Sequence, residues 1–440
     1  MINKLKNIGR KQDFLSFSGN LIYAILGFLS FILLTRSLDK DVFGQWVLFV
    51  TTANFVDMFR FGITRTAVVR FLAGASDEEK NKIIGSNWAI SLFFTAFTAL
   101  LVLLVNILFH KQISNTGFAL FFSWYPVFAF LNLPFNNALT VLQAKLQFGK
   151  ILKLRTISIL LFDTFLLINL FYLKLNIIQI LIIFLIITAI PSIYSLIFSW
   201  DGLPKIKYYD KKITKKILNF GKYTTGTLIG SNLLKSADTF IIGLSPVLGT
   251  EGVAMYSIPL KLTEVMEIPL RSFAATAFPK MSKASIENNV KKVKELFYKY
   301  SGALTLLFIP FTIVNLVFAD FFVVILGGDK YIDTANIYRL FCLYGLILPL
   351  DRFSGVGLDA INRPKENFYK VVFMVLANIV GDIIAVWYFQ SLFGVALITI
   401  LMTLVGILVG YYFFNKEIDI NFKKIFTEGF LFLKNFKQNL

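Results

Sequence analysis

The sequence has very few of the residues that build most enzyme active sites and metal centres. Its 440 residues include one cysteine, Cys342, and one histidine, His110. A single cysteine excludes a disulfide within the chain, and a single histidine excludes a metal site built from several histidines. No G-x-x-x-x-G-K-[ST] phosphate loop and no H-E-x-x-H motif occurs. We therefore expect no enzymatic activity, no cofactor, no metal centre and no ATP-driven pump.

Charged residues are also scarce. They make up 16% of the chain, whereas hydrophobic residues make up 56% and phenylalanine alone occurs 49 times. Globular domains are roughly half apolar and about a quarter charged. The excess apolar residues gather in runs of about twenty, the length that crosses the hydrocarbon core of a bilayer. Because the runs are continuously apolar rather than alternating, they predict an all-α polytopic membrane protein and not a β-barrel.

The apolar runs predict about twelve transmembrane helices. Their approximate limits are 14–35, 42–64, 83–109, 117–143, 151–173, 177–200, 217–244, 252–278, 297–319, 335–361, 367–390 and 393–414. Lys and Arg, 44 in all against 26 Asp and Glu, gather in alternate connections and in both terminal tails. Since cytoplasmic loops are the ones enriched in Lys and Arg, this pattern predicts cytoplasmic N- and C-termini. The same pattern accounts for the excess of basic residues, so nucleic-acid binding is not needed to explain it.

Two segments resemble each other at a distance of 210 residues. LDKDVFGQW (38–46) introduces the second predicted span, and LGTEGVAMY (248–256) introduces the eighth. The same shift carries Asp57 onto Glu267 and places Arg60 one residue from Arg271. An even number of spans in each half gives both halves the same orientation, as in parallel-repeat transporters. The repeat therefore predicts two pseudo-symmetric lobes of six helices each.

The repeat and the loop composition divide the chain into four parts. We expect an N-lobe at 1–204, a basic cytoplasmic connection at 205–216, a C-lobe at 217–414 and a cytoplasmic amphipathic tail at 415–440. The tail mixes phenylalanines with lysines and is too short in its apolar run to span a bilayer. It is therefore predicted to be an interfacial helix, with a partly disordered tail as the alternative.

Ionisable residues inside the predicted spans are the candidate functional groups. A charge at the bilayer centre costs at least ~2.5–3.5 kcal/mol, so such groups face the protein interior or a water-filled cavity. One interpretation is local pairing, since Asp57 and Arg60 are three residues apart and Glu267 and Arg271 are four apart. Asp351 would similarly pair with Arg339 or Arg352. Lys235 and Lys261 have no obvious partner in the sequence.

The other interpretation is a polar cavity with a basic lining. Arg offers a planar fork for phosphate or carboxylate, and Lys adds a point charge, so an anionic cargo is expected. The candidate substrate-binding residues are Arg60, Arg271, Lys235, Lys261 and Arg352. The candidate residues for a coupling ion or for pairing are Asp57, Asp238, Glu264, Glu267 and Asp351. A proton or Na⁺ is the expected coupling ion.

The chain also resembles a known family. SNLLKSADTFIIGLSPVLGTEGVAMYSIPLKLTEVMEIPLRSFAATAFPKMS (231–282) has Asp238 before an apolar run ending in Gly243, then Gly252, Tyr256 and Pro279. With LTRSLDKDVFGQW (34–46), these features resemble polysaccharide flippases of the Wzx type. Such flippases belong to the multidrug/oligosaccharidyl-lipid/polysaccharide exporter superfamily.

The resemblance implies a MATE-like V of two six-helix lobes in the bacterial cytoplasmic (inner) membrane. It implies alternating-access transfer of an undecaprenyl-pyrophosphate-linked oligosaccharide from the cytoplasmic to the periplasmic leaflet, for O-antigen of lipopolysaccharide, capsule or exopolysaccharide. The implied partners are this lipid-linked oligosaccharide, membrane lipids, and the polysaccharide polymerase and chain-length machinery. By position, Arg60 and Arg271 are the first candidates for contact with the pyrophosphate, followed by Lys235 and Lys261.

Two other functions stay open. A cation-coupled multidrug exporter of the same superfamily would favour an acidic, aromatic cavity, which the basic residues within the spans argue against. A glycan-assembly enzyme such as a polymerase would need larger outer loops than this chain provides. Lipid II as cargo is disfavoured, because the first span lacks a clear basic residue and those flippases commonly have two additional spans.

Overall fold

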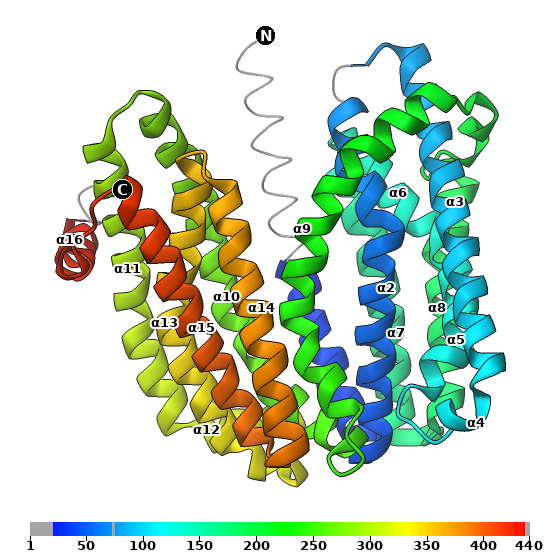
Figure 1. Cartoon of the computed structure of the whole chain (residues 1–440). Coiled ribbons are helices and arrows are strands. Elements are labelled where there is room, and N and C mark those ends of the chain that lie inside the picture. Colours follow the sequence, from blue (N-terminus) through cyan, green and yellow to red (C-terminus); the bar gives the residue numbers. More distant parts are fainter. Residues whose placement is uncertain (1–20, 73–74, 436–440) are drawn as a thin grey trace. The chain divides into compact units, whose positions relative to one another are not determined.

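The computed structural model describes residues 21–72 and 75–435, and all regular structure in these residues is helical (Figure 1). The chain divides into two compact units, Met1–Asn232 and Leu233–Leu440, and the division falls inside helix α9 (Lys211–Gly243).

Before α9, the first unit contains a helix over Leu21–Ser37, α2 (Lys40–Leu72), α3 (Asp77–Leu108), α4 (His110–Ile113), α5 (Ala119–Leu131), α6 (Leu133–Ala144), α7 (Phe148–Ile168), the π-helical turn η1 (Asn169–Leu173), α8 (Ile177–Ile197) and the 3₁₀ turn η2 (Leu203–Tyr208). After α9, the second unit contains α10 (Gly249–Ile286), α11 (Val290–Val317), α12 (Ala319–Gly327), η3 (Asp329–Thr334), α13 (Ala335–Ala360), α14 (Pro364–Ile383), η4 (Ile384–Tyr388), α15 (Leu392–Glu417) and α16 (Phe422–Asn435).

The predicted spans overlap these helices in the described part of the chain, but the predicted span 117–143 is divided into α5 and α6. Among the described residues, eight helices are long and apolar enough to cross a membrane, and Leu21–Ser37 and Ala119–Leu131 are shorter apolar helices. The start of the first predicted span, before residue 21, lies outside the described residues. Helices α9 and α10 have spanning length, but charged and polar residues interrupt their apolar stretches. The fold is therefore the all-α, multi-pass membrane protein that the apolar runs predict.

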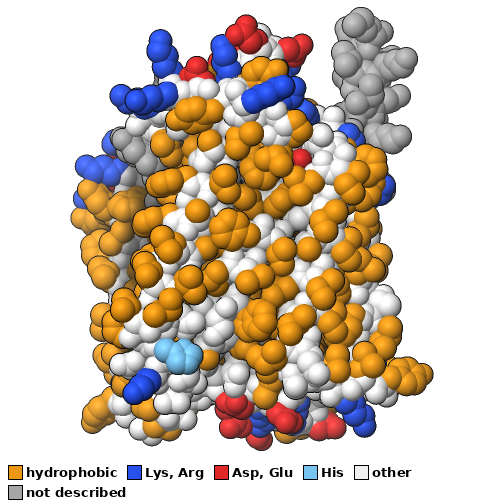
Figure 2. Space-filling model, turned by 90° about the vertical axis from the view of Figure 1, so that its right-hand side faces the viewer, with side chains coloured by type: hydrophobic (Ala, Val, Ile, Leu, Met, Phe, Trp, Pro, Cys, Tyr) orange, Lys and Arg blue, Asp and Glu red, His pale blue; other side chains and the backbone are white. Residues whose placement is uncertain are grey.

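The outer surface of the first unit is suited to lipid. Figure 2 looks onto the side where α3 and α5 lie and shows a band of hydrophobic side chains with charged side chains gathered at its two ends. On α3 the exposed residues include Phe93, Phe97, Ile107 and Leu108. Large exposed apolar surfaces are unusual on soluble monomers. A band of this kind is the expected surface of a protein whose solvent is the acyl-chain region of a bilayer.

Aromatic packing joins the helices of the first unit. Trp46 of α2 stacks on Phe162 of α7 with ring centroids 5.8 Å apart, and Phe184 of α8 meets Trp46 edge-on at 5.2 Å. Stacked and edge-to-face geometries of this kind are the favourable ones for aromatic pairs. The high phenylalanine content thus supplies both a lipid-facing surface and an internal core.

The connection between α8 and α9 is packed against α3. Trp88 of α3 donates its indole N–H to the backbone carbonyl of Asp201 at 2.8 Å. Gly85 lies one turn earlier, and a Cβ there would be 2.3 Å from the carbonyl oxygen of Lys205 in η2. Gly202 has φ +81°, a left-handed conformation that favours glycine. The lysine-rich connection is therefore held by specific contacts at its start.

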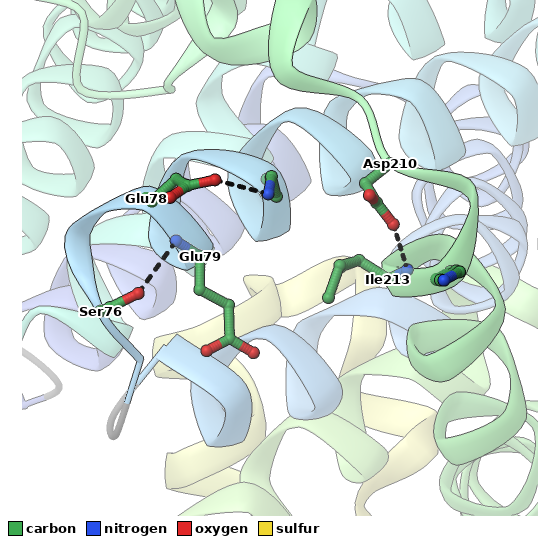
Figure 3. A pocket seen from close by; sticks show the side chains of 7 residues that line it. Ser76, Glu78, Glu79, Asp210 and Ile213 are labelled. Atoms are coloured by element: carbon green, nitrogen blue, oxygen red, sulfur yellow. Dashed lines mark hydrogen bonds and ion pairs between the residues drawn. The ribbon is translucent and has the colours of Figure 1, made fainter.

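A polar recess lies where the first turns of α3 and α9 meet (Figure 3). The residues that line it are Ser76, Glu78, Glu79, Lys82, Asp210, Lys212 and Ile213. Its polar groups largely satisfy one another: Ser76 caps the N–H of Glu79, and Glu78 pairs with Lys82 at 2.7 Å. Asp210 accepts a bond from a backbone N–H in the first turn of α9 at 2.8 Å. The recess is thus explained by helix capping and offers little to a ligand.

Asp201 gives a pH-dependent test of the packed connection. Burial raises the pKa of its carboxyl above the usual 3.8, although backbone N–H donors, including that of Leu203, act to lower it. Because the folded pKa is raised, the ionised carboxylate destabilises the fold, and stability falls as pH rises from the unfolded pKa through the folded one. Asp201→Asn is expected to raise the melting temperature of the purified protein at neutral pH by a few degrees, with the gain vanishing under acidic conditions.

The control is Asp419→Asn, because Asp419 is 95% exposed and its pair with Lys294 spans 3.8 Å. This variant should melt with the wild type at every pH, since an exposed pair contributes little. A pH-independent effect of Asp201→Asn would contradict the assigned cause.

Candidate functional site

Arg60 lies at the centre of a buried polar network in the first unit. Its side chain has no exposed surface, and its Nη1 lies 2.5 Å from Oδ1 of Asp57, one turn earlier on α2. Nη2 donates to Oγ1 of Thr95 on α3 at 2.9 Å and to the backbone carbonyl of Ala129 on α5 at 2.6 Å. Nε also donates to Thr95 at 3.2 Å. The planar guanidinium therefore ties three helices together through bonds within its own unit.

Asp57 is held by further donors from the region where α5 breaks. The hydroxyl of Tyr125 donates to its Oδ1 at 3.0 Å, and Nδ2 of Asn132 donates to its Oδ2 at 3.3 Å. Asn132 stands between α5 and α6, and Pro134, near the start of α6, lacks the N–H that would continue the ladder of α5. The break thus brings the amide of Asn132 to the ion pair. The predicted pairing of Asp57 with Arg60 is present, in a closed environment.

The equivalent pair in the second unit is open. Arg271 donates to the carboxylate of Glu267 one turn earlier on α10, and Lys235 of α9 donates to both oxygens of that carboxylate at 2.9 Å. The Arg271 side chain is 66% exposed and that of Lys235 is 54% exposed. We call Lys235, Glu267 and Arg271 the α9–α10 cluster. It presents two cations around one carboxylate and has a net positive charge.

Lys235 and Lys261 both have acidic partners, which corrects the sequence-based view that they lacked them. Lys235 reaches Glu267 from the neighbouring helix, a contact that sequence separation did not reveal. Lys261 pairs with Glu264 three residues later on α10 at 2.7 Å. That spacing was visible in the sequence, so the second pair was predictable from helix geometry.

Asp351 pairs with neither arginine that the sequence suggested. Its Oδ1 lies 2.7 Å from Nζ of Lys370 on α14, and Lys370 also donates to the Asp351 carbonyl at 2.6 Å. Arg339 instead pairs with Asp320 at 2.6 Å, and Arg352 is exposed. The long stem of Lys370 carries its ammonium to a site where the side chain is only 4% exposed. This pair is buried structure within the second unit.

A second group of polar residues is buried within the second unit. Asp238 of α9 accepts from the hydroxyl of Tyr256 at 2.5 Å and from Nδ2 of Asn378 on α14 at 2.9 Å. Asn378 also donates to Asp382, one turn later on α14. Thr399 of α15 lies 3.4 Å from the Asp238 carboxylate. We call these five residues the buried carboxylate cluster.

The buried carboxylate cluster lacks a cationic side chain. Asp238 is 5% exposed and Asp382 is fully buried, yet neither forms an ion pair with Lys or Arg within the described residues. Oδ1 of Asp382 and Oδ1 of Asn378 also have no hydrogen-bond partner there. Two buried negative charges side by side are costly unless a proton or a cation neutralises them. Carboxylate, amide and hydroxyl oxygens are ligands that suit such a hard cation.

The sequence pointed to only part of this cluster. Asp238 was a candidate coupling residue, and Asp382 was recognisable as an intramembrane carboxylate without a role. The four-residue spacing of Asn378 and Asp382 places both on one face of a helix, which was the available signal. The approach of Asp238 from α9, 140 residues away in sequence, was not predictable from spacing.

These features define a helical membrane protein with ionisable side chains inside its helices. The structure aligns with that of an inward-facing multidrug resistance MATE family transporter of the MOP superfamily, with a TM-score of 0.74 and 15% sequence identity. The alignment covers 90% of this chain and 96% of that transporter. The structure also aligns with the lipid II flippase MurJ in an inward closed conformation, with a TM-score of 0.72 and 18% sequence identity. That alignment covers 96% of this chain and 91% of MurJ. These similarities establish the MATE-like fold.

The chain belongs to the polysaccharide biosynthesis protein family, whose sequence profile matches residues 10–285. The MatE profile matches residues 224–384. The chain is 24% identical to the putative O-antigen transporter of Shigella flexneri over 77% of its own length and 81% of that protein. It is 23% identical to the teichuronic acid biosynthesis protein TuaB of Bacillus subtilis over 50% of its own length and 44% of that protein. The resemblance to polysaccharide flippases of this superfamily is thus confirmed at the level of the family.

The closed environment of Arg60 predicts a structural role that can be measured. Arg60→Met leaves the Asp57 carboxylate buried without its cationic partner, and breaking a buried pair in this way costs about 3–5 kcal/mol. The variant should lose folded, monodisperse protein at a markedly lower temperature than the wild type. The matched control is Arg65→Met on the same helix, since the Arg65 side chain is exposed and donates to Oε1 of Gln143 at 3.1 Å rather than to a buried carboxylate. Equal stability of Arg60→Met and the wild type would contradict the structural assignment.

Proposed function

We propose that the chain is a flippase for an undecaprenyl-pyrophosphate-linked oligosaccharide. It moves this cargo by alternating access from the cytoplasmic to the periplasmic leaflet of the bacterial cytoplasmic membrane, with both of its termini in the cytoplasm. The product supplies O-antigen, capsule or exopolysaccharide synthesis, so the polysaccharide polymerase and chain-length machinery are the proposed downstream partners. Membership of the polysaccharide biosynthesis protein family and similarity to a putative O-antigen transporter support this proposal.

The observation that carries the proposal is the exposed positive charge of the α9–α10 cluster. Arg271 lies well inside a helix of 38 residues, yet two thirds of its side chain is exposed. An arginine at membrane depth is expected to face water or a polar ligand rather than lipid. Arg271 and Lys235 together match a diphosphate, because a guanidinium binds phosphate oxygens in a bidentate manner and an ammonium adds charge.

Glu267 gives the cluster a resting state. Its carboxylate accepts from both cations, which keeps them paired and oriented. A diphosphate would compete with one carboxylate for the same donors, so binding is an exchange of partners. Such an exchange keeps affinity modest, and modest affinity allows the head group to leave on the other side. Lys261 and Arg352 are further candidate contacts, and Glu264 is the partner that Lys261 would exchange.

Arg60 receives a different role from Arg271 in this proposal. Its donors are taken by Asp57, Thr95 and the Ala129 carbonyl. Cargo contact by Arg60 would require this buried network to open, whereas Arg271 needs only to exchange Glu267. We therefore assign first contact with the diphosphate to the α9–α10 cluster, and the support of helices α2, α3 and α5 to Arg60 and Asp57.

The buried carboxylate cluster is the proposed site of the coupling ion. Either a proton or Na⁺ would neutralise Asp238 and Asp382, and either would bind more tightly in the state where the cluster is closed. The cluster draws on α9, α10, α14 and α15. Ion binding there would consequently fix four helices of the second unit relative to one another, which is a direct means of coupling ion occupancy to its conformation.

A cation-coupled multidrug exporter is the second candidate, favoured by the MatE profile match over residues 224–384. An exporter of organic cations is expected to have an acidic cargo site. The net positive charge of the α9–α10 cluster disfavours this candidate. No enzymatic step is part of either proposal.

Alanine variants of the α9–α10 cluster test the cargo assignment. Arg271→Ala and Lys235→Ala should each insert and fold normally, because both side chains are more than half exposed. Each should lower surface polysaccharide and cause lipid-linked repeats to accumulate in the inner leaflet, with the double variant near complete loss. The measurement is complementation of a deletion strain, with cell-surface polysaccharide and lipid-linked intermediates both quantified.

The control for this experiment is Arg339→Ala, which removes an arginine that pairs with Asp320 in a different part of the unit. It should retain surface polysaccharide at the wild-type level. Normal polysaccharide in the Arg271→Ala, Lys235→Ala double variant would overturn the cargo assignment.

The coupling proposal is tested with Asp382→Asn. This change keeps the shape of the side chain and removes one of the two charges that require neutralisation. If Na⁺ is the coupling ion, the wild type should melt at a higher temperature in Na⁺ than in K⁺. A Na⁺ concentration one hundred times Kd should stabilise the folded state by about 2.7 kcal/mol. Asp382→Asn should abolish this difference between the two ions. If a proton is the ion, the wild type should show no Na⁺ shift, and transport by the variant should lose its dependence on the pH gradient. A variant that keeps the wild-type ion dependence would contradict the site.

A further inference from the structure

Helix α16 has an apolar face that is wider than one helix contact requires. Its sequence is FKKIFTEGFLFLKN. Ile425 and Gly429 are buried and recur four residues apart. Phe422, Phe426 and Phe430 recur at the same spacing on an adjacent stripe, since positions i and i+4 share a helix face. The helix therefore has two neighbouring apolar stripes and a third, polar face.

The first stripe is fixed to α11 by a contact between glycines. A Cβ on Gly302 would lie 1.8 Å from the carbonyl oxygen of Ile425, and a Cβ on Gly429 would lie 2.4 Å from the backbone of Gly302. Side chains larger than hydrogen are excluded at both positions, so the two backbones touch directly. Small residues permit this kind of close helix packing.

Further contacts hold α16 at its two ends. The hydroxyl of Tyr298 on α11 accepts a hydrogen bond from the backbone N–H of Asn421, just before α16, at 2.8 Å. Near the other end, Phe432 packs against Tyr300 with ring centroids 6.2 Å apart, and Nζ of Lys299 lies 4.2 Å from the centre of the Phe432 ring. The position of α16 on the second unit is thus specified by α11.

The second stripe is only partly covered by the unit. Phe422 packs against Tyr411 of α15 with ring centroids 5.7 Å apart, yet it is 48% exposed, and Phe430 is 60% exposed. Lys423 and Lys434 are exposed on the adjoining polar face. Figure 1 shows α16 nearly end-on beside α11, so its axis runs across the spanning helices of the same unit. A helix that crosses a spanning helix in this way runs along the membrane plane rather than through it.

We propose that α16 is a docked membrane-surface helix that binds an anionic leaflet. Phe422 and Phe430 lie among the upper acyl chains, while Lys423 and Lys434 contact phosphate groups of the lipids. The occupant is a lipid leaflet rather than a protein partner, because the uncovered face combines aromatic residues with flanking lysines and lies along the membrane plane. Apolar residues on one side and Lys on the other are the pattern of interfacial helices that favour anionic lipids.

Site-directed spin labelling of the full-length protein tests the depth of the two faces. Cys342 is buried, and its replacement by alanine leaves a background for a single label. Labels are placed by Phe430→Cys on the exposed apolar stripe and by Lys424→Cys on the polar face, six residues away and exposed. In bilayers of phosphatidylcholine with phosphatidylglycerol, the label at 430 should be accessible to oxygen and shielded from a water-soluble nickel chelate. The label at 424 should show the opposite preference.

The lysines are tested with Lys423→Gln and Lys434→Gln in the Phe430→Cys background. Replacement of phosphatidylglycerol by phosphatidylcholine should make the label at 430 shallower in the parent and have little effect in the double lysine variant. Each lysine should account for about a fivefold change in the preference for the anionic leaflet. These measurements do not depend on transport, so they remain decisive whatever the cargo is.

Two outcomes would overturn the proposal. Equal access of the nickel chelate to labels at 430 and 424 would place α16 in water. Spin–spin broadening at 430 that disappears on dilution with unlabelled protein would show that a second copy of the chain covers the stripe instead of lipid.

Discussion

The cost of an unpaired charge in a low-dielectric interior is the constraint on which this structure depends. An ion transferred from water to such an interior loses several kcal/mol even after relaxation, and attraction to a partner compensates only when the geometry is good. Two buried ion pairs follow this rule. Arg60 meets Asp57, and Lys370 meets Asp351, each with additional hydrogen bonds from the surrounding helices. Asp163 and Asp201 are buried carboxylates that accept hydrogen bonds but form no ion pair among the described residues. The two proposed functional sites depart from charge balance in opposite directions.

The first departure is an excess of positive charge, and the second is an excess of negative charge. The α9–α10 cluster balances two cations with one carboxylate and leaves the cations exposed. The buried carboxylate cluster holds two carboxylates bridged by a single amide and has no cationic side chain as partner among the described residues. An imbalance of either sign favours a mobile ion or ligand of the opposite sign. A cargo anion and a coupling cation, at sites that lie one helical turn apart on α9, satisfy both imbalances.

Much of the fold was predictable because the membrane imposes simple rules on the sequence. Apolar runs of sufficient length located the helices, and even the polar helices α9 and α10 were recognised from their flanking apolar residues. The paired charges Asp57–Arg60 and Glu267–Arg271 were also predictable, because helix periodicity places them on one face. The difference between their environments was not. Burial of Arg60 depends on Thr95 and on the break at Asn132, which are distant in sequence, whereas the Glu267 carboxylate is shared with Lys235 from another helix. An ion pair between two different helices, such as Lys370 with Asp351, likewise leaves no pattern in the local sequence.

The proposed flippase moves a lipid carrying a diphosphate-linked oligosaccharide between leaflets. The most direct measurement uses purified protein in liposomes that contain a fluorescent polyprenyl-diphosphate oligosaccharide, with an added membrane-impermeant quencher. We expect the protein to expose inner-leaflet label to the quencher faster than in protein-free liposomes, and a lipid with the same sugar but no diphosphate to be moved much more slowly. Equal rates with and without protein, or equal rates for the two lipids, would contradict it.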